Sequence, residues 1–382
     1  MKRPASTIAA IVVVLLLACA VQAQTPAEAI ELERQGKLPE AEQAWRGIIA
    51  RNPKDAAALA SLGVVLSKQQ KYPEAASAYK KALALNPKLP GIELNLGLAE
   101  FKQGHFSAAI QPLRAALAAD PSSTQAQTLL GMSYYGTKKF ALAAQSLAPV
   151  AAAEPENAEL HQILAQSCLW SKSYSCALEQ FRLLLQQNPD SAETHILLGE
   201  ALDGESRTEE AIQEFDAAAK ISPRLPNVNF GLGYLYWKTQ RYDLARQKFE
   251  AELETDPSNA QALAYIGDIE WKNDHPEAAL SFLLRAEKIN DRLRIVQTDL
   301  GAIYLQQKNY KSAKASLLRA VALDPDQPDA HYQLGRLYQA QSDKAAAEKE
   351  LHKAQELHQK AEDKLLGKIS SSPPALNPPA KE

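Results

Sequence analysis

The stretch "YPEAASAYKKALALNP" occupies residues 72–87, and "YKSAKASLLRAVALDP" occupies residues 310–325. Both place an aromatic residue, two alanines and a closing Asn-Pro or Asp-Pro at the same positions. Their starting positions, 72 and 310, differ by 238, which is seven times 34. Self-similarity at a fixed period of this size is typical of repeat architectures, so we expect one structural unit to recur along the chain.

This repeat frame runs without an insertion through nearly the whole chain. Leu-Gly pairs such as Leu62-Gly63 recur in it, and proline closes most of the units. One alanine is present in every copy, at Ala41, Ala75, Ala109, Ala143, Ala177, Ala211, Ala245, Ala279, Ala313 and Ala347. Ten concordant copies indicate that each unit has the same fold.

Each unit is predicted to form two helices, because apolar residues recur at three- and four-residue spacing and no stretch alternates like a strand. Gly63 on the first helix and Ala75 and Ala82 on the second lie where the two axes approach most closely. Proline ends each pair, since it cannot continue a helix. One pair cannot bury its apolar faces alone, so neighbouring pairs must stack into an elongated core.

This pattern resembles the tetratricopeptide repeat family, whose unit carries Leu-Gly, an aromatic residue, alanine, a second aromatic residue and a closing proline at the same period. The resemblance covers residues 25 to about 361. It implies an all-α fold, a right-handed α-solenoid or superhelix of tandem helix-turn-helix pairs. The chain departs from the family at the fourth position of each unit, where tryptophan is common and where His161, His195 and His331 stand here.

The repeat frame also predicts the domain boundaries. Residues 24–369 form the solenoid, with a truncated first repeat at 25–55, nine full repeats at 56–361 and a C-terminal capping helix after them. Residues 370–382 are rich in proline and polar residues, so we expect a disordered tail there.

The amino terminus has the features of a secretion signal. Lys2 and Arg3 precede an apolar run that is too short to span a membrane, and small residues at 21–23 form a cleavage site. Residues 1–23 are therefore predicted to be removed on export to the bacterial periplasm or cell envelope. "LLAC", ending at Cys19, loosely resembles a lipobox, so a lipid anchor on Cys19 is the alternative to a soluble protein.

Export would place Cys168 and Cys176, the two cysteines of the folded part, in an oxidising compartment. A disulfide between them is one expectation. The other is that they are two small, half-buried residues that never meet.

Composition and motifs argue against nucleic-acid binding and catalysis. The chain has 42 basic and 45 acidic residues, and loss of Lys2 and Arg3 leaves 42 − 2 = 40 against 45, a net charge of −5 without long runs of one sign. No phosphate-binding loop, nucleophile elbow or His-Glu-x-x-His motif occurs. We expect no enzyme activity, no cofactor and no metal, including at His161 and His195.

In the resembled family the inner, concave face is lined by the first helix of each unit and binds peptide segments. The fifth, ninth, twelfth and thirteenth positions of each unit should face it. The predicted groove residues are Phe101, Met132, Tyr135, Trp170, Phe230, Tyr234, Trp237, Lys238, Trp271 and Lys272. About half of the apolar side chains on this face are expected to be core instead, Leu94, Leu98 and Leu169 first.

The lysines beside the two repeat-related tryptophans, Trp237 and Trp271, would let the groove grip an apolar or aromatic segment with acidic neighbours. The family's clamp for an acidic carboxyl terminus is not expected, because Val64, Leu98 and Met132 occupy its positions.

Three functions remain open from the sequence. The first is an exported, non-catalytic scaffold that binds protein or peptide partners in its groove, as an envelope assembly factor. The second is a structural subunit of a secretion or pilus complex that associates with itself. The third is a groove for a glycan or small molecule.

Overall fold

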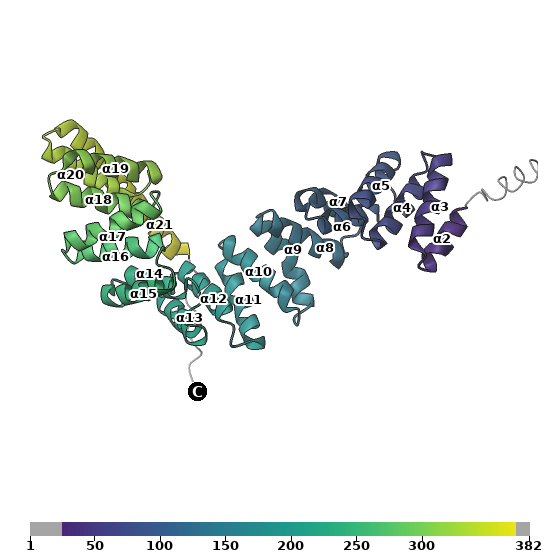
Figure 1. Cartoon of the computed structure of the whole chain (residues 1–382), viewed down its shortest axis with the longest axis horizontal. Helices are drawn as coiled ribbons and strands as arrows, with labels where there is room; N and C mark the ends of the chain where they lie inside the picture. The colour runs from purple at the N-terminus through teal and green to yellow at the C-terminus, as the bar shows by residue number, and fades with distance from the viewer. Residues whose placement is uncertain (1–24, 372–382) are drawn as a thin grey trace, which may run out of the picture. The chain divides into compact units, whose positions relative to one another are not determined.

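The computed structural model describes residues 25–371, with side chains described as far as residue 363. These residues form twenty helices and no strand (Figure 1). The all-α prediction is therefore confirmed. The predicted signal peptide, Cys19 and residues 372–382 of the predicted tail lie outside the described residues.

The chain divides into two units at Pro189 and Asp190, and each holds five helical hairpins in its described part. Unit 1 contains α2 (Pro26–Arg34), α3 (Leu38–Arg51), α4 (Ala56–Lys68), α5 (Tyr72–Leu85), α6 (Ile92–Lys102), α7 (Phe106–Ala119), α8 (Thr124–Gly136), α9 (Phe140–Ala153), α10 (Ala158–Trp170) and α11 (Tyr174–Gln187). Unit 2 contains α12 (Ala192–Gly204), α13 (Thr208–Ile221), α14 (Val228–Lys238), α15 (Tyr242–Thr255), α16 (Ala260–Lys272), α17 (Pro276–Ile289), α18 (Arg294–Gln306), α19 (Tyr310–Leu323), α20 (Pro328–Ala340) and α21 (Lys344–Ser371).

Short polar side chains start many of the first helices. Thr25 and Glu28 form a reciprocal capping box ahead of Pro26. Asp55, Ser123 and other caps accept a hydrogen bond from the backbone N–H three residues on. These contacts satisfy N–H groups that have no partner inside the helix.

The turn inside each hairpin also recurs with the repeat. One residue there has a positive φ, and it is glycine only at Gly36 and Gly104. The next residue donates its N–H back into the first helix, as Lys71 does to the carbonyl oxygen of Leu66 at 2.9 Å. This is the Schellman arrangement that ends a helix in a left-handed residue. In the other hairpins the residue with the positive φ is Gln70, Lys138, Lys172, Ser206, Gln240, Asp274, Lys308 or Ser342.

The Leu-Gly glycines lie where the two helices of a hairpin touch. A Cβ atom on Gly301 would lie 2.5 Å from Cγ and Cδ2 of Leu317, which is fully buried. A Cβ on Gly63 would lie 2.4 Å from the ring of Tyr79. The partner is always sixteen positions later, so the predicted closest approach at Gly63 is confirmed and recurs through both units.

Polar residues cross-link three of the hairpins at the unusual fourth position. His161, His195 and His331 each place Nδ1 2.6 Å from the side-chain oxygen of the residue nineteen positions later. These partners are Gln180, Glu214 and Glu350. The histidines therefore tie a first helix to its own second helix.

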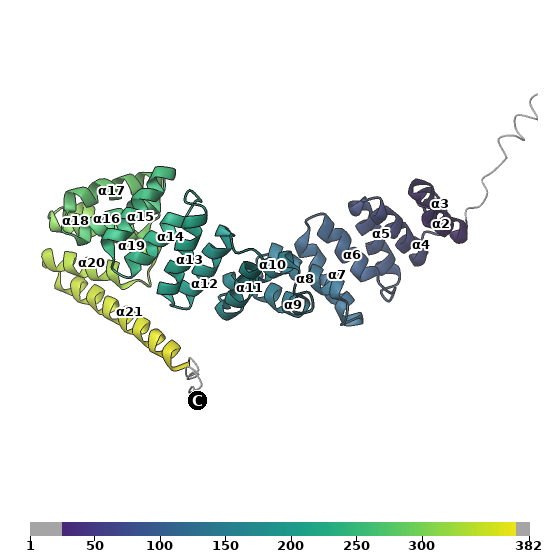
Figure 2. The ribbon, with the colours of Figure 1, turned by 90° about the horizontal axis from the view of Figure 1, so that it is seen from below.

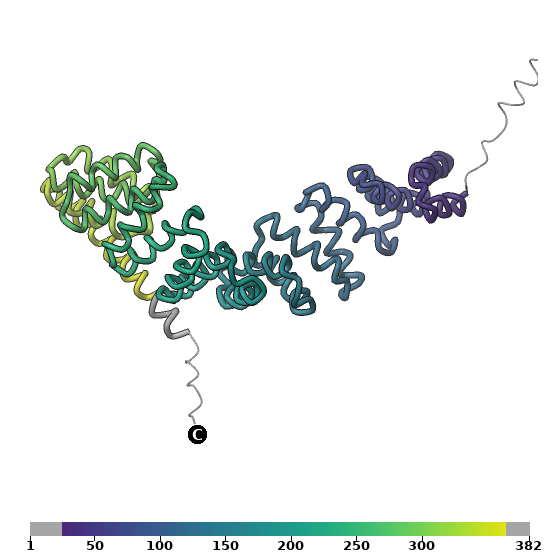
Figure 3. Tube along the Cα trace, turned by 60° about the horizontal axis from the view of Figure 1, so that its bottom comes forward, coloured from purple at the N-terminus to yellow at the C-terminus, as the bar shows by residue number. Residues whose placement is uncertain are grey.

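Stacking of the hairpins differs on the two sides of each unit. From α4 to α10 in unit 1 and from α14 to α20 in unit 2, consecutive first helices pack directly, whereas consecutive second helices in residues 25–371 make no comparable contact. Figure 3 traces the successive hairpins. A stack whose first helices are closer together curves toward them, so the first helices line the inner side of the curve in each unit.

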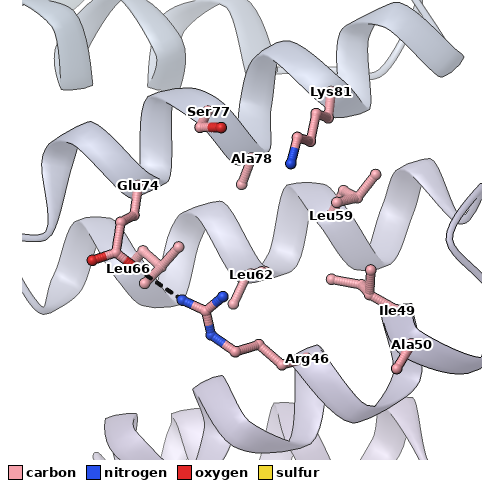
Figure 4. Close-up of a pocket in the computed structure, with 10 residues that line it drawn as sticks. All are labelled: Arg46, Ile49, Ala50, Leu59, Leu62, Leu66, Glu74, Ser77, Ala78 and Lys81. Atoms are coloured by element: carbon pink, nitrogen blue, oxygen red, sulfur yellow. Dashed lines mark hydrogen bonds and ion pairs between the residues drawn. The ribbon is translucent and has the colours of Figure 1, made fainter.

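A pocket of about 400 Å³ shows the separation of the second helices in unit 1 (Figure 4). Its walls come from α3 and α5, and Leu59, Leu62 and Leu66 of α4 form its floor. Arg46 and Glu74 form a 2.8 Å ion pair across it. This pocket is the gap left where two outer helices diverge over an inner one.

The last hairpin ends in a long helix. α21 runs without a break from Lys344 to Ser371, so the second helix of the last hairpin and the expected capping segment are one helix (Figure 2). Ala347, Ala354 and Leu357 are buried, and residues 358–363 are exposed.

Cys168 at the end of α10 and Cys176 near the start of α11 form a disulfide. Cys168 is fully buried. The bond joins the two helices of one hairpin across its turn.

We expect Gly301→Ala to lower the free energy of unfolding by up to about 2 kcal/mol. An exposed Gly→Ala change in a helix raises stability by about 1 kcal/mol, but here overpacking against Leu317 costs about 1–3 kcal/mol. Chemical denaturation followed by circular dichroism measures the change. Gly301→Ala combined with Leu317→Ala should lose less stability than the two single changes added together, and strict additivity would contradict the contact.

Reduction of the Cys168–Cys176 disulfide should lower the free energy of unfolding by roughly 2–3 kcal/mol, because the bond restricts the unfolded chain over a short loop. The measurement compares denaturation midpoints with and without dithiothreitol. The double variant Cys168→Ala, Cys176→Ala is the control, because the reductant should leave its midpoint unchanged. An equal midpoint for reduced and oxidised wild-type protein would show that the bond contributes nothing.

Candidate functional site

The predicted groove residues lie on the first helices, which face the inner side of each unit. In unit 1 they belong to α6, α8 and α10, and in unit 2 to α14 and α16. Each unit therefore carries its own set of candidate residues.

In unit 1 the predicted residues fall into two aromatic contacts. Phe101 meets Phe106 edge-to-face at 5.3 Å between ring centroids, and Phe101 packs against the core with Leu94 and Leu98. Tyr135, Phe140 and Trp170 form a cluster in which Tyr135 and Trp170 stack at 5.7 Å. Trp170 is 47% exposed, whereas its neighbour Leu169 is buried. Met132, on the same helix as Tyr135, is half-buried.

In unit 2 the predicted aromatic residues pack around a ring that was not among the predicted groove residues. Tyr265 of α16 lies between Trp237, at 4.9 Å edge-to-face, and Phe249, at 5.3 Å stacked. Phe230 and Tyr234 contact the same ring. These rings support one another, so Phe230, Tyr234 and Trp237 are half-buried components of the fold.

The position of Phe230 depends on a buried carboxylate. Glu252 of α15 is 2% exposed and accepts hydrogen bonds from the backbone N–H groups of Asn227 and Phe230, at 3.2 and 3.1 Å. α14 has no side-chain cap of its own. Glu252 therefore satisfies the free N–H groups at the start of this helix, where a negative charge is favourable.

Trp237 is fixed by Asp268 of the next first helix. Its Nε1 donates to Oδ2 of Asp268 at 2.5 Å, and Lys272 Nζ lies 2.5 Å from the same oxygen. Lys272 also lies 4.8 Å from the centre of the Trp237 ring, where a cation is attracted to the π face. Tyr135 and Gln166 make the equivalent contact in unit 1, also at 2.5 Å.

The two predicted groove lysines already have acidic partners. Lys238 lies 2.6 Å from Asp203, and Lys272 is held by both oxygens of Asp268. Their charges are therefore largely balanced within the protein.

Two pockets open on the inner face of unit 2, and they occupy equivalent places two repeats apart. We call them the Gly231 pocket and the Asp299 pocket, after two residues that hold the same position in their repeats. The Gly231 pocket measures about 380 Å³ and the Asp299 pocket about 350 Å³. The Gly231 pocket is lined by Ile196, Glu200, Asp203, Phe215, Asn227, Phe230, Gly231, Tyr234, Leu235 and Gln261. The Asp299 pocket is lined by Trp237, Asp268, Trp271, Lys272, Arg294, Ile295, Thr298, Asp299, Asp329, Tyr332 and Gln333.

Asp299 is the unusual group of the second pocket. Its side chain is 8% exposed, and its Oδ2 is buried with no hydrogen-bond partner in the described part of the chain. Burial raises the pKa of this carboxyl well above its usual value, and the nearby negative charge of Asp268 raises it further. Buried polar groups without a partner are uncommon in folded proteins, so this carboxyl calls for an explanation.

Tryptophan and tyrosine line the same pocket. Trp271 packs partly against the core of α16, α17 and α18, and Tyr332 of α20 is 51% exposed. At the rim, Arg294 lies 3.6 Å from Asp329. The pocket therefore combines aromatic surface with three carboxyl groups and two basic groups.

Four residues of this region were not predicted from the sequence, for two reasons. Asp268 and Tyr332 occupy the ninth and fifth positions, which were expected to face the groove, but Asp268 is acidic and Tyr332 lies in the last unit. Tyr265 and Asp299 occupy the sixth position, which the repeat frame did not assign to the groove. A charged residue in the middle of a buried helical stripe was the available signal for Asp299.

Other kinds of site find no support in the part of the chain that the structure describes. Among those residues, no group of three or more His, Cys, Asp or Glu side chains is arranged to hold a metal ion. None of the helices within residues 25–371 is both long enough and apolar enough to cross a membrane.

Comparison with known proteins gives matches along most of the chain. Models described as tetratricopeptide repeat or TPR repeat match residues 27–90, 66–133, 128–192, 171–226, 230–292, 301–342 and 328–360. Over 71 residues the chain is 35% identical to the type IV pilus assembly protein PilF of Pseudomonas aeruginosa. That match covers 19% of this chain and 28% of the pilus protein, so the chain spans under a third of that relative.

The chain is also similar to solved structures. The APC/C hetero-tetramer Cut9–Hcn1 matches with a TM-score of 0.51 at 14% identity, over 86% of this chain and 80% of that one. MamA MSR-1 matches with a TM-score of 0.39 at 24% identity, over 43% of this chain and 95% of that one. With its recurring hairpins, their close-packed glycines and the matches of the family models, the chain belongs to the tetratricopeptide repeat family.

Proposed function

We propose that this protein is an exported, non-catalytic scaffold that binds an extended segment of a protein partner on the inner face of unit 2. The fold is that of a protein-interaction scaffold, and the proposal adds the place and the kind of ligand. The segment would run across α14, α16, α18 and α20, with side chains entering the Gly231 and Asp299 pockets.

The observation that carries this proposal is the pair of equivalent pockets two repeats apart on one face. An extended peptide presents its side chains at a regular spacing, so a face with regularly placed pockets suits it. Trp271 and Tyr332 lie beside the second pocket, and aromatic side chains of this kind are frequent at the centres of protein interfaces. The first helices are held by packing and buried hydrogen bonds, so little ordering is needed on binding.

The cell envelope is the proposed location. The predicted secretion signal at residues 1–23 supports export, and the Cys168–Cys176 disulfide suits an oxidising compartment. The segment shared with a type IV pilus assembly protein supports a role in assembling an envelope structure. A soluble periplasmic form is proposed, with lipid attachment at Cys19 as the alternative.

Trp271→Ala should weaken peptide binding at least about tenfold, because truncation of an aromatic residue at an interface commonly costs about 2 kcal/mol or more. The ligands would be selected from a library of short random peptides displayed on phage, with the purified full chain as bait. Affinity of the synthesised peptides is then measured by isothermal titration calorimetry.

Trp170→Ala is the matched control, since Trp170 is also a tryptophan near the end of a first helix but belongs to unit 1. It should change the affinity less than about twofold, and both variants should keep the helical circular dichroism of the wild type. If Trp271→Ala and wild type bound the peptides equally, the inner face of unit 2 would not be the binding site. If no peptide were selected, that result would contradict the proposed function itself.

A further inference from the structure

Asp299 has no hydrogen-bonded cationic partner although two basic side chains line its pocket. Lys272 Nζ is held by Asp268 at 2.5 and 2.8 Å. Arg294 lies 3.6 Å from Asp329. Each basic group is thus matched to a different carboxyl. Asp299 is the third carboxyl, and the pocket has one acidic group more than basic groups.

Burial of the Asp299 carboxyl without a basic partner lowers the stability of the folded state. A buried acid must either ionise without a paired counter-charge or remain protonated with a hydroxyl that has no acceptor, and both states are unfavourable. An apolar residue at this place would avoid the cost. At the equivalent place in the Gly231 pocket the chain has glycine, so the repeat itself does not require an acid there.

The walls of the pocket suit a flat cation. Trp271 and Tyr332 present aromatic surface, which attracts cations through the negative face of the ring. Asp299 lines the pocket, so a ligand held there can reach its carboxyl group. With about 350 Å³ of space, the pocket is large enough for a long side chain and too sparse in ligands for a metal ion.

We propose that the Asp299 pocket binds an arginine side chain of the partner's peptide, with the guanidinium paired to Asp299 and lying against Trp271 and Tyr332. Arginine is chosen over lysine because the guanidinium is planar, less strongly hydrated and able to stack on aromatic rings while it pairs with a carboxylate. This inference rests on the proposed function and specifies the chemistry of its ligand.

Binding of an arginine side chain at Asp299 should depend on pH. The charged groups around Asp299 are Asp268 and Lys272 on α16, Arg294 on α18 and Asp329 on α20. In the free protein, burial and the negative charge of Asp268 hold the pKa of Asp299 high despite the two basic groups. A bound guanidinium favours the ionised carboxylate and so lowers that pKa. Binding therefore releases a proton, and affinity should rise with pH until the pH exceeds the pKa of the free protein.

The test uses N-acetyl-arginine methylamide as the probe, with the full chain labelled for observation of its tryptophan indole N–H signals by NMR. The probe should shift the signal of Trp271, assigned by Trp271→Phe, and its affinity, measured over a series of pH values, should rise with pH before it levels off. The neutral isostere N-acetyl-citrulline methylamide should bind at least about tenfold more weakly.

Asp299→Asn should weaken arginine binding at least about tenfold and abolish its pH dependence. Asp243→Asn is the control, because it removes the same charge from an exposed residue of α15 in the same unit. Tyr332→Ala removes an exposed part of the pocket wall. Weaker binding of the arginine probe to this variant would support the proposal independently of Asp299.

Asp299→Asn should also keep the fold. The pKa of Asp299 is higher in the folded protein than in the unfolded chain, so the folded protein binds more protons. The contribution of this group to stability therefore falls as the pH rises above the pKa that Asp299 has in the unfolded chain. Relative to wild type, the melting temperature of Asp299→Asn should therefore increase as the pH rises above about 4, the usual pKa of an aspartate in an unfolded chain. A large loss of melting temperature instead would show that Asp299 has a structural partner.

The outcomes separate the two proposals. Equal binding of the arginine and citrulline probes, binding by N-acetyl-lysine methylamide alone, or full binding by Asp299→Asn would overturn the arginine pocket. If peptides selected on phage bind through Trp271 but carry no arginine, the proposed function stands and this inference fails. If arginine is enriched in those peptides, and the enrichment is lost when Asp299→Asn is the bait, both the proposed function and the arginine pocket are supported.

Discussion

The close approach of two helices at a glycine determines this structure. In each hairpin with a Leu-Gly pair, the glycine of the first helix faces a large side chain sixteen positions later, such as Leu317 opposite Gly301. A side chain larger than alanine, which occupies this position at Ala29 and Ala165, would separate the two axes. The turn is fixed in the same way, because a left-handed residue ends the first helix and directs the second one back along it. The recurrence of one hairpin geometry follows from these two local constraints.

Stacking of similar hairpins then produces two different faces within each unit. The first helices contact one another, while the second helices diverge and leave gaps such as the one crossed by Arg46 and Glu74. The inner face is consequently the more ordered surface. Its aromatic residues are largely used to hold successive hairpins together, as Trp237 does through Tyr265 and Asp268. What remains available is confined to pockets between these contacts.

The two pockets of unit 2 show how a repeat protein acquires a specific site. Their backbones are equivalent, but glycine lines one and a buried, unpaired aspartate lines the other. Stability alone does not favour that aspartate, since a buried acid without a partner lowers the stability of the folded state. Groups with strongly perturbed pKa values are frequent at functional sites. The proposed arginine ligand would account for this difference between the pockets.

The sequence alone determined the repeat, the helical hairpins and the close contact at Gly63, because each depends on residues within one repeat unit. It also placed the candidate groove on the first helices. Only the tertiary structure decided which aromatic rings of that face are packed and which are exposed, and which carboxyl each lysine meets. Those outcomes depend on side chains from two or three different hairpins, and a local pattern contains no information about how those side chains share the space between helices. The repeat frame did not assign the position of Asp299 to the groove, and the isolation of Asp299 could not be predicted because it results from Lys272 and Arg294 having other partners.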